Sequence, residues 1–424
     1  MKLTDAEKRM LDGEQGLLKQ KAIEKVVQYA NVLGAEELCK VTKAHLFCGS
    51  HPYLRAMNSD DFDEVVSEMH FCSSRKIIFD RVDHECYCQS DVGPMCPMNW
   101  QKMRVSEEEH ARNMGYLKRY LDAGVQLVGT CIPYLTGFIP LMGEHYVSSE
   151  SHAVLMMNSL WGACGHADGL EAGFWSAVCG RTPLWGLHKM DNRKGTHVFH
   201  IECPTETLLD WDLLGYTIGR KTPTHSVPVL ASGFQRPDIV KLKSAFASMA
   251  TTGGPEMCHI VGITPEARTL KETLGGNAAV EIIGITMDDI AESIDMLCEK
   301  GSGTLDFISL GCPHYTIDQL AQVANFLKGK KIHPEVELQV WTASPIRETA
   351  DRCGYTKSIE DSGANFLTSS CPLTSEKVPP GSRAMAFDSA KQAHYIKPGT
   401  SAKVFYGSME DCLASALSGY WEGR

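Results

Sequence analysis

The sequence predicts an α/β fold with mostly parallel sheets, arranged in more than one lobe. Through the second half of the chain, short apolar stretches typical of buried strands alternate with stretches whose apolar residues have helical spacing. Such alternation predicts parallel sheets that helices cover on both faces. With 424 residues, 43% of them hydrophobic, the chain is long enough to bury more than one core.

Three of the predicted strands are built alike, and each leads to a cysteine with a proline close behind it. They span residues 125–130 before Cys131, residues 304–310 before Cys312 and residues 364–370 before Cys371. A glycine placed like a helix C-cap precedes each strand, and the proline prevents the strand from continuing. Because open α/β sheets bind ligands at the carboxyl ends of their strands, we expect these thiols to converge on one site.

The N-terminal part carries clear helix signals. Thr4 and Glu7 form a capping box, and a helix is expected over Leu17 to Leu33. Ser106 caps a later helix with an inner face of Met114, Leu117 and Leu121. Between these helices, a strand from Val41 leads into a turn of Cys48, Gly49 and Ser50. The backbone N–H groups of this turn either approach an anionic ligand or belong to an ordinary turn.

Two further segments are rich in polar side chains. Ser148, Ser149 and Glu150 precede an apolar helix, where they either cap it or, with its N-terminus, hold a charged group of a substrate. Arg193 and Lys194 lie in a predicted loop, which is either solvated or binds an acidic substrate.

The densest group of possible metal ligands lies between residues 83 and 96 and consists of His84, Cys86, Cys88 and Cys96. The Cys-x-Cys spacing lacks the gap of structural zinc knuckles, and no second half follows at zinc-ribbon spacing. The segment either binds a separate metal or forms a loop at the mouth of the main site, with its cysteines as small buried hydrophobes.

Prolines and glycines accumulate between Cys203 and Val229, which indicates a lobe boundary. We expect an N-terminal lobe over residues 1–205, a middle lobe over 206–335 and a C-terminal α/β segment over 336–424, each carrying one of the three cysteines. Helices are expected from Asp238, Thr286, Thr316 and Ser344, and an irregular tail after Cys371.

Composition excludes several classes of protein. The net charge of −11, without a basic cluster, argues against nucleic acid as the main partner. Residues 1–10 carry no apolar signal region, and the most apolar stretch, 153–163, is too short to cross a bilayer. We therefore expect a cytoplasmic protein whose 16 cysteines are reduced thiols or metal ligands.

Three convergent thiolates suit a metal site that stays open to substrate, since a fourth ligand would close it. An iron–sulfur cluster held in this way has one iron free to bind a hydroxyl group as a Lewis acid, which suits the dehydration of a hydroxy acid. A bound zinc ion, or three unconnected buried cysteines, would leave the same signature in the sequence.

Short motifs around the cysteines resemble the large subunit of the aconitase X family. They are Gly-Thr-Cys-Ile-Pro-Tyr at 129–134, Leu-Gly-Cys-Pro-His at 310–314 and Thr-Ser-Ser-Cys-Pro at 368–372. Along nearly the whole chain, further short stretches match the same family in order, at 13–16, 149–154, 186–188, 191–194, 214–216, 262–266 and 342–344. Each stretch is weak alone, but together with the cysteines they are specific.

The resemblance implies an aconitase-like fold of α/β/α layers and an iron-dependent hydro-lyase with its site between lobes. Cys131, Cys312 and Cys371 would hold an iron–sulfur cluster (4Fe-4S, 3Fe-4S or 2Fe-2S) or a mononuclear iron. The residues that would contact the substrate are Cys48, Gly49, Ser50, Ser149 and Glu150. The family also implies a small swivelling-domain subunit, expected here as a separate polypeptide, with a serine of that subunit as the base.

Two activities occur in this family: dehydration of cis-3-hydroxy-L-proline to 1-pyrroline-2-carboxylate, and dehydration of mevalonate 5-phosphate. The phosphomevalonate type resembles Gly-Ala-Arg-Thr-Asn where this chain has Gly162-Ala-Cys-Gly-His166, and it lacks the cysteine-rich segment. Both departures favour hydroxyproline, with phosphomevalonate as the alternative. A non-catalytic iron–sulfur sensor is a hypothesis of another class, and the polar loops at 49–50, 148–150 and 192–194 argue against it.

Overall fold

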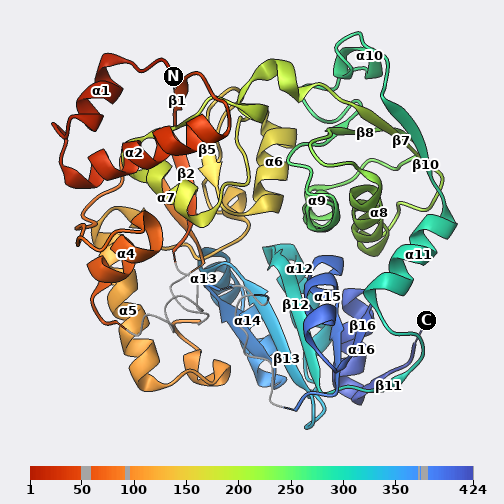
Figure 1. Cartoon of the computed structure of the whole chain (residues 1–424). Coiled ribbons are helices and arrows are strands. Elements are labelled where there is room, and N and C mark those ends of the chain that lie inside the picture. Colours follow the sequence, from red (N-terminus) through yellow and green to blue (C-terminus); the bar gives the residue numbers. More distant parts are fainter. Residues whose placement is uncertain (49–58, 91–95, 371–372, 374–380, 424) are drawn as a thin grey trace.

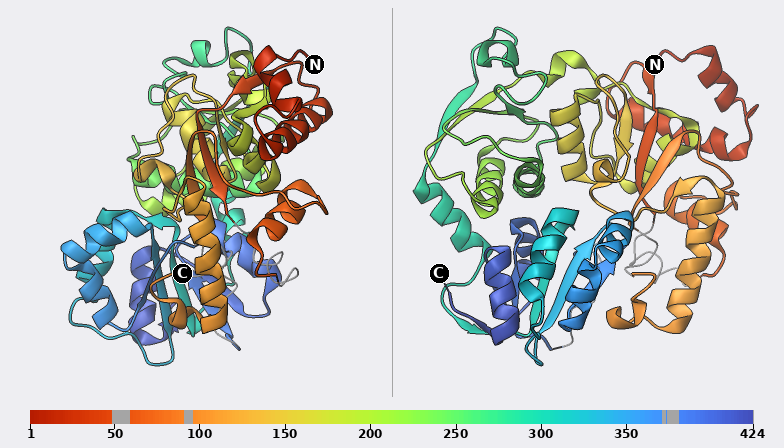
Figure 2. Two further views of the ribbon diagram at one scale, coloured as in Figure 1. Left: turned by 90° about the vertical axis from the view of Figure 1, so that its left-hand side faces the viewer. Right: turned by 180° about the vertical axis from the view of Figure 1, so that it is seen from behind.

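A computed structural model describes residues 1–48, 59–90, 96–370, 373 and 381–423 of the chain. Three mainly parallel sheets lie in three parts of the molecule, which follow one another along the sequence (Figure 1). The first part is red to yellow, the second green and the third teal to blue, and Figure 2 shows the same division from the side and from behind. The α/β fold with mostly parallel sheets is therefore confirmed.

The first part contains a parallel sheet in the order β4-β3-β2-β5. Its strands are β2 (Lys43–Phe47), β3 (Glu85–Ser90), β4 (Val125–Gln126) and β5 (Tyr146–Ser148), and a separate antiparallel pair joins β1 (Leu38–Lys40) to β6 (Arg181–Pro183). The helices are α1 (Asp5–Leu11), α2 (Leu17–Val32), α4 (Phe62–Phe71), α5 (Glu107–Asp122), α6 (Ser151–Trp161) and α7 (Leu170–Cys179). Short 3-10 turns are η1 (Trp100–Met103), η2 (Pro133–Leu135), η3 (Gly186–His188) and η4 (Met190–Arg193).

The second part contains a parallel sheet in the order β10-β7-β8-β9. Its strands are β7 (His197–Ile201), β8 (Pro228–Ser232), β9 (His259–Ile260) and β10 (Glu281–Ile285). Its helices are α8 (Leu208–Lys221), α9 (Ile239–Thr252), α10 (Leu270–Thr273) and α11 (Met287–Leu297). As predicted, the Thr286 side chain caps α11, and it does so in a capping box with Asp289.

The third part contains a parallel sheet in the order β14-β13-β12-β15-β16. Its strands are β12 (Phe307–Tyr315), β13 (Glu337–Thr342), β14 (Asn365–Thr368), β15 (Ala384–Phe387) and β16 (Lys403–Tyr406), and β11 (Gly303–Thr304) pairs with β17 (Tyr420–Trp421). The helices are α12 (Ile317–Leu327), α13 (Ser344–Arg352), α14 (Tyr355–Asp361), α15 (Ala390–Ile396) and α16 (Met409–Ser418), and η5 (Lys397–Gly399) is a 3-10 turn.

Two predictions about local structure were wrong. The segment after Cys371 is no irregular tail, because β15 and β16 extend the sheet beyond β12 and bury short apolar runs against α15 and α16. The inner face of α5 was only partly right: Leu117 is buried as predicted, but Met114 and Leu121 are 39% and 51% exposed, whereas Tyr116 and Tyr120 are buried. Large aromatic rings on the neighbouring helical stripe bury more area than Met and Leu do.

The strand that leads to Cys312 also runs further than predicted. Strand β12 continues to Tyr315, with a shift in its register against β13 between Leu310 and Tyr315. Gly311 at the start of this bulge has φ of 100°, and a Cβ there would lie 2.4 Å from the carbonyl oxygen of Trp341. Only glycine fits, and the bulge accommodates Pro313, which has no N–H to donate to the ladder. The irregularity displaces Cys312 from a regular strand position.

The three parts share one core, which positions their strand ends relative to one another. A single cluster of buried side chains includes Tyr134 of the first part, Phe199 and Trp211 of the second and Phe307 and Phe387 of the third. The lobe boundaries at 205/206 and 335/336 stay a prediction, although β12 and the strand before Cys371 lie in one sheet. No helix among the described residues is long and apolar enough to span a membrane.

Candidate active site

His314 connects the segments that carry the three cysteines. Its backbone N–H donates to Cys131 Sγ at 3.4 Å, and its Nδ1 lies 3.0 Å from Thr130 Oγ1. Its Nε2 lies 2.8 Å from the carbonyl oxygen of Ser370, directly before Cys371. Because a carbonyl oxygen only accepts, Nε2 carries the proton and Nδ1 accepts from the threonine hydroxyl. One imidazole from the β12 bulge therefore holds Thr130 and Ser370 in place. The strand predicted over residues 125–130 is shorter than expected, because β4 ends at Gln126 and Thr130 lies in the segment that follows it.

Burial fixes the charge state of this imidazole. It lowers the pKa of His314 to about 4, although the hydrogen bond to Ser370 acts in the opposite sense. A neutral ring donates on one side and accepts on the other, as the contacts to Ser370 and Thr130 require.

The segments before Cys131 and Cys371 approach each other closely. Gly129 has φ of 50°, and a Cβ there would lie 2.5 Å from Ser369 Cα. Ser369 itself adopts a left-handed conformation with φ of 68°, and its hydroxyl lies 2.6 Å from Ser344 Oγ. A non-glycine residue in this region is strained, and such strain clusters at functional sites.

Lys243 of α9 places a buried cation against the backbone that follows Cys312. Its Nζ donates to the carbonyl oxygens of Pro313 and His314 at 3.2 and 2.7 Å and to Gln319 Oε1 at 2.9 Å. Burial lowers the pKa of Lys243 to about 8, whereas negative charge on Cys131 would raise it. The second part of the molecule thus contributes a positive charge directly behind the β12 bulge.

A second buried cation, Lys391 of α15, pairs with Glu150 at the start of α6. The distance from Lys391 Nζ to Glu150 Oε1 is 2.8 Å, and His152 Nδ1 lies 3.2 Å from the same oxygen. Burial alone would raise the pKa of Glu150, but Lys391 and His152 hold it well below its ordinary value. Burial alone would lower the pKa of Lys391, but the charges of Glu150, Cys312 and Cys131 raise it.

Ser149 continues this network towards β2. Its hydroxyl donates to Gln89 Oε1 at 2.6 Å and accepts from the Phe47 N–H at 2.9 Å, and Gln89 Nε2 donates to Glu150 Oε2 at 2.7 Å. The Glu150 side chain also caps α6 by accepting from the His152 N–H at 3.5 Å. The capping function predicted for this segment is therefore confirmed.

The other predicted site residues are placed only in part. Cys48 is buried, with its Sγ 3.7 Å from the carbonyl oxygen of Leu46, at the carboxyl end of β2. Gly49, Ser50 and Cys371 lie outside the described residues. Their assigned functions stay predictions.

The interpretation of Arg193 as a solvated or substrate-binding cation was wrong. Its guanidinium is buried and pairs with Glu266 through Nε at 3.1 Å and Nη2 at 2.6 Å. It also donates to the carbonyl oxygens of Leu187 and Asn158 at 3.2 and 3.0 Å. Glu266 comes from a distant segment, so the sequence around Arg193 gave no sign of this pair.

The cysteine-rich segment is described at residues 83–90 and at Cys96. Cys86 and Cys88 lie in strand β3, so the prediction of a loop was wrong for them, and all three cysteines are fully buried, as expected of small hydrophobes. Cys96 Sγ lies 3.5 Å from Thr368 Oγ1, on the strand that leads to Cys371. Cys96 thus lies next to the region of Thr130, Cys131, the β12 bulge and Ser370, which we call the cysteine edge.

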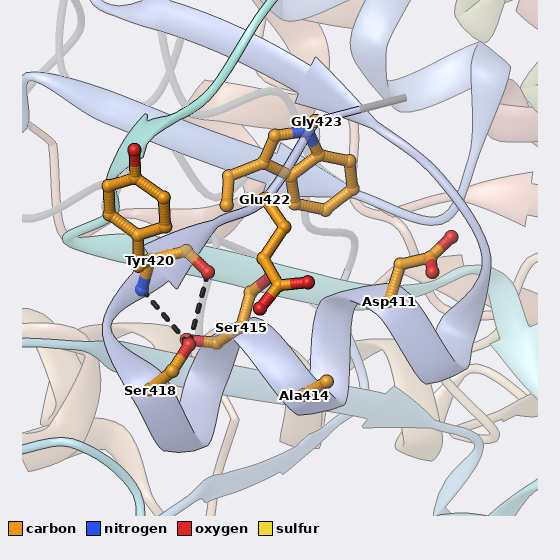
Figure 3. Close-up of a pocket in the computed structure, with 8 residues that line it drawn as sticks. Asp411, Ala414, Ser415, Ser418, Tyr420, Glu422 and Gly423 are labelled. Atoms are coloured by element: carbon orange, nitrogen blue, oxygen red, sulfur yellow. Dashed lines mark hydrogen bonds between the residues drawn. The ribbon is translucent and has the colours of Figure 1, made fainter.

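Two cavities differ in their relation to this edge. One of about 500 Å³ lies between Asp388 and Gly407, which follow β15 and β16, and the start of α8. The other, of about 210 Å³, is formed by α16 and β17, where Ser418 Oγ bonds the backbone of Tyr420 (Figure 3). The second cavity lies near the amino end of β12, because the Leu305 N–H donates to Gly419 at 2.9 Å, so it is remote from Cys312.

Sequence reasoning missed His314, Lys243 and Lys391. His314 directly follows the cysteine–proline pair, which was a usable signal. The two lysines lie in helices with many apolar residues. A lysine in such a helix usually extends its ammonium group to solvent, so nothing in the sequence marks these two as buried. Only the packing of α9 and α15 against the cysteine edge gives them a function.

Comparison of the sequence with known proteins identifies one family. Family models described as the first, second and third domains of aconitase X match residues 1–191, 195–295 and 305–418. The phosphomevalonate dehydratase large subunit of Methanocaldococcus jannaschii is 28% identical over 97% of this chain and 99% of its own length. The cis-3-hydroxy-L-proline dehydratase of Hypocrea jecorina is 32% identical over 72% of this chain and 52% of its own length.

A solved structure shows that the likeness extends to the whole architecture. The holo-form of aconitase X from Thermococcus kodakaraensis has a TM-score of 0.83 and 25% identity, covering 98% of this chain and all of that one. The named relatives are dehydratases, and the family models follow one another along nearly the whole sequence. The chain belongs to the aconitase X family of dehydratases.

Proposed function

We propose that this chain is the large subunit of an iron-dependent dehydratase that converts cis-3-hydroxy-L-proline to 1-pyrroline-2-carboxylate. Cys131, Cys312 and Cys371 would hold the iron. The observation that carries the proposal is the position of His314, which joins the residue before Cys371 to Thr130 and Cys131. Because Thr130, Ser370 and the β12 bulge are tied to one imidazole, we infer that the three cysteines next to them belong to one site.

The residues at this edge suit an anionic thiolate–iron group. Cys131 and Cys312 are buried thiols, and the ammonium groups of Lys243 and Lys391 lie close enough to interact with their charge. The buried Ser370 hydroxyl has no hydrogen-bond partner among the described residues, which leaves a donor for a group at the edge. When bound, iron with an open coordination position would act as a Lewis acid on the substrate hydroxyl. The set fits clusters of several nuclearities and a single iron ion.

Substrate contacts are proposed for residues that follow β2 and β5. Cys48 directly follows β2, and Ser149 and Glu150 directly follow β5, so these three residues lie at the carboxyl edge of one sheet. Gly49 and Ser50 come next to Cys48 in the sequence and are proposed with it. Ser149 and Glu150 are fixed by Gln89 and Lys391, so their oxygens are oriented before a substrate arrives. Such preorganisation lowers the cost of holding a small molecule in one geometry.

The base is proposed to be a serine of a small partner subunit. Relatives along the full length of this chain are named large subunits, which supports a separate partner. The chain's own contribution would be to orient the substrate so that its C2 proton faces that subunit while the C3 hydroxyl faces the cysteines.

The choice between the two substrates rests on the cations at the edge. Among the described residues there, Lys243 and Lys391 are buried and already paired with backbone carbonyls and with Glu150. Neither ammonium is available to a phosphate group, which favours unphosphorylated hydroxyproline. The segment Gly162–His166, whose difference from the phosphomevalonate type also favours hydroxyproline, runs beside β5, with Cys164 next to His145 and the following Ala167 next to Ser148. Full-length similarity to phosphomevalonate dehydratase large subunits keeps mevalonate 5-phosphate as the alternative.

The non-catalytic sensor remains a hypothesis of another class. Of the polar loops that argued against it, residues 148–150 lie at the cysteine edge, whereas Arg193 is buried in an ion pair elsewhere. Binding of a hydroxy acid to the iron-loaded protein separates the two classes.

The test is anaerobic purification with iron and sulfide analysis, followed by dehydration assays with each substrate, with and without the small subunit. We expect iron, and turnover of cis-3-hydroxy-L-proline only when the small subunit is present. Turnover of mevalonate 5-phosphate alone would overturn the substrate. Iron with no turnover and no binding of either compound would favour the sensor, and zinc in place of iron would overturn the assignment of the cysteines.

A further inference from the structure

A second group of possible metal ligands lies at the opposite end of the first sheet from the cysteine edge. Cys39 belongs to β1, His145 directly precedes β5, and His188 ends η3. One ligand atom of each lies within 4.8 Å of the ligand atoms of the other two. Three segments far apart in the sequence thus bring a thiol and two imidazoles together.

The distance between the two rings suits a shared ion. His145 Nδ1 lies 3.1 Å from His188 Nδ1. Nitrogen ligands at the usual 2.0–2.1 Å from a tetrahedral zinc ion lie about 3.3 Å apart. Without an ion, these two nitrogens share one proton and form a single hydrogen bond, so a geometry close to that of two ligands is already present.

His188 is placed so that one ring nitrogen faces the other possible ligands. The ring is buried, and its Nδ1 is the atom that lies against His145. An imidazole already oriented by its surroundings loses little further freedom when it binds an ion.

The donor types select the class of metal. One thiolate and two imidazoles suit zinc and similar transition-metal ions, whereas magnesium and calcium prefer oxygen ligands. Cys164 pairs in parallel with His145, so a second sulfur lies nearby. Cys39 would bind the ion as a thiolate, and its proton would be released to solvent on binding.

We propose that Cys39, His145 and His188 bind a zinc-class ion that is separate from the iron centre and ties β1, β5 and η3 together. His145 precedes β5, whereas Ser149 and Glu150 follow it. At about 3.3 Å per residue, the backbone positions of His145 and Ser149 are about 13 Å apart. The proposal does not depend on the substrate or on the iron ligands.

The first test is metal analysis of the anaerobically purified protein together with its variants. We expect zinc in addition to iron in the unmodified chain, and loss of the zinc with retention of the iron in Cys39→Ser and His188→Gln. Cys179→Ser is the matched control, since Cys179 is also a buried thiol near a backbone carbonyl, 3.7 Å from Arg181 O. It should keep both metals. Zinc retained in Cys39→Ser would overturn the proposal.

A second measurement covers the case in which a variant fails to fold. Zinc is removed from the unmodified protein with a chelator, and Co²⁺ is added while visible absorption is recorded. A thiolate-to-cobalt charge-transfer band is expected, together with a higher midpoint of thermal unfolding. His188→Gln should weaken the band, and Cys179→Ser should leave it unchanged. Absence of the band in the unmodified protein would overturn the proposal even if iron and dehydratase activity were intact.

Discussion

Two groups of buried polar side chains in the first part of the molecule differ in how far the protein pairs them. In the group that follows β5, Glu150 is buried but paired with Lys391, and its pKa is held below the ordinary value. In the group around Cys39, His145 and His188, the rings and carboxyls are less completely paired: His188 Nε2 and the nearby Asp168 Oδ2 have no hydrogen-bond partner among the described residues. The paired network indicates a centre that the chain organises by itself, whereas the unpaired atoms indicate a region that a ligand or proton completes.

The largest expected effect is the loss of iron from the proposed cysteine site without loss of zinc from the proposed Cys39 site. Cys312→Ser and Cys131→Ser should each lose bound iron and reduce turnover to the background rate, because two thiolates and a hydroxyl hold iron poorly. Zinc at the Cys39 group should be unaffected. Iron and zinc analysis of the same samples checks both statements, and Cys258→Ser, another buried thiol, serves as the control. Iron retained by both variants would contradict the assignment.

The next effect concerns the residue that joins the strand ends. His314→Gln should reduce turnover by about 10- to 100-fold, the usual cost of removing a residue that orients metal ligands. The glutamine keeps the backbone N–H that donates to Cys131 but not both ring contacts, to Thr130 and Ser370. Iron should still bind, more weakly, which a chelator competition measures. Turnover equal to that of the unmodified protein would show that His314 does not position the centre.

The fold was far more predictable than these contacts. Alternation of apolar strands and capped helices predicted the parallel sheets, and the helix expected from Thr316 is present, capped by Thr316 in a capping box with Gln319. That the segments before Cys312 and Cys371 lie in one sheet followed from the predicted topology, whereas the approach of Cys131 from another sheet depends on packing between the parts. His314, Lys243 and Glu266 were missed because each acts through a partner at least 56 positions away, a relation that local periodicity does not encode. Both cavities likewise depend on tertiary packing.

A third prediction tests whether the group that follows β5 depends on charge pairing. Lys391→Met leaves Glu150 buried beside His152 without its cation, which should destabilise the fold by roughly 3–5 kcal/mol. The double variant Lys391→Met with Glu150→Gln removes the uncompensated charge and should recover part of the loss. Thermal unfolding of both variants measures the difference. If the double variant were no more stable than the single one, the ion pair would not be the cause.

The smallest expected effect comes from Asp168, whose buried Oδ2 has no hydrogen-bond partner among the described residues. Burial raises the pKa of Asp168 from 3.8 to about 7, with His166 acting in the opposite sense and Glu256 adding to the rise. The folded state therefore keeps a proton that the unfolded chain loses near pH 4, so this group makes the protein less stable as pH rises from about 4 to 7. Asp168→Asn cannot ionise and should be more stable than the unmodified protein by at least about 1 kcal/mol at pH 8, with no difference near pH 4.

Asp212 provides the matched control for that substitution. It is also a buried carboxyl, but it accepts from the hydroxyls of Ser244 and Tyr406 at 2.8 and 2.7 Å and from the Ala390 N–H at 2.7 Å. An amide at this position would turn an NH₂ group towards donors, so Asp212→Asn should lower stability at every pH. Thermal unfolding of both variants across pH 4 to 8 decides the matter. If Asp168→Asn and Asp212→Asn changed stability equally, the number of hydrogen-bond partners would not govern the stability of these buried acids. The contrast between the two groups of buried polar side chains would then lose its basis.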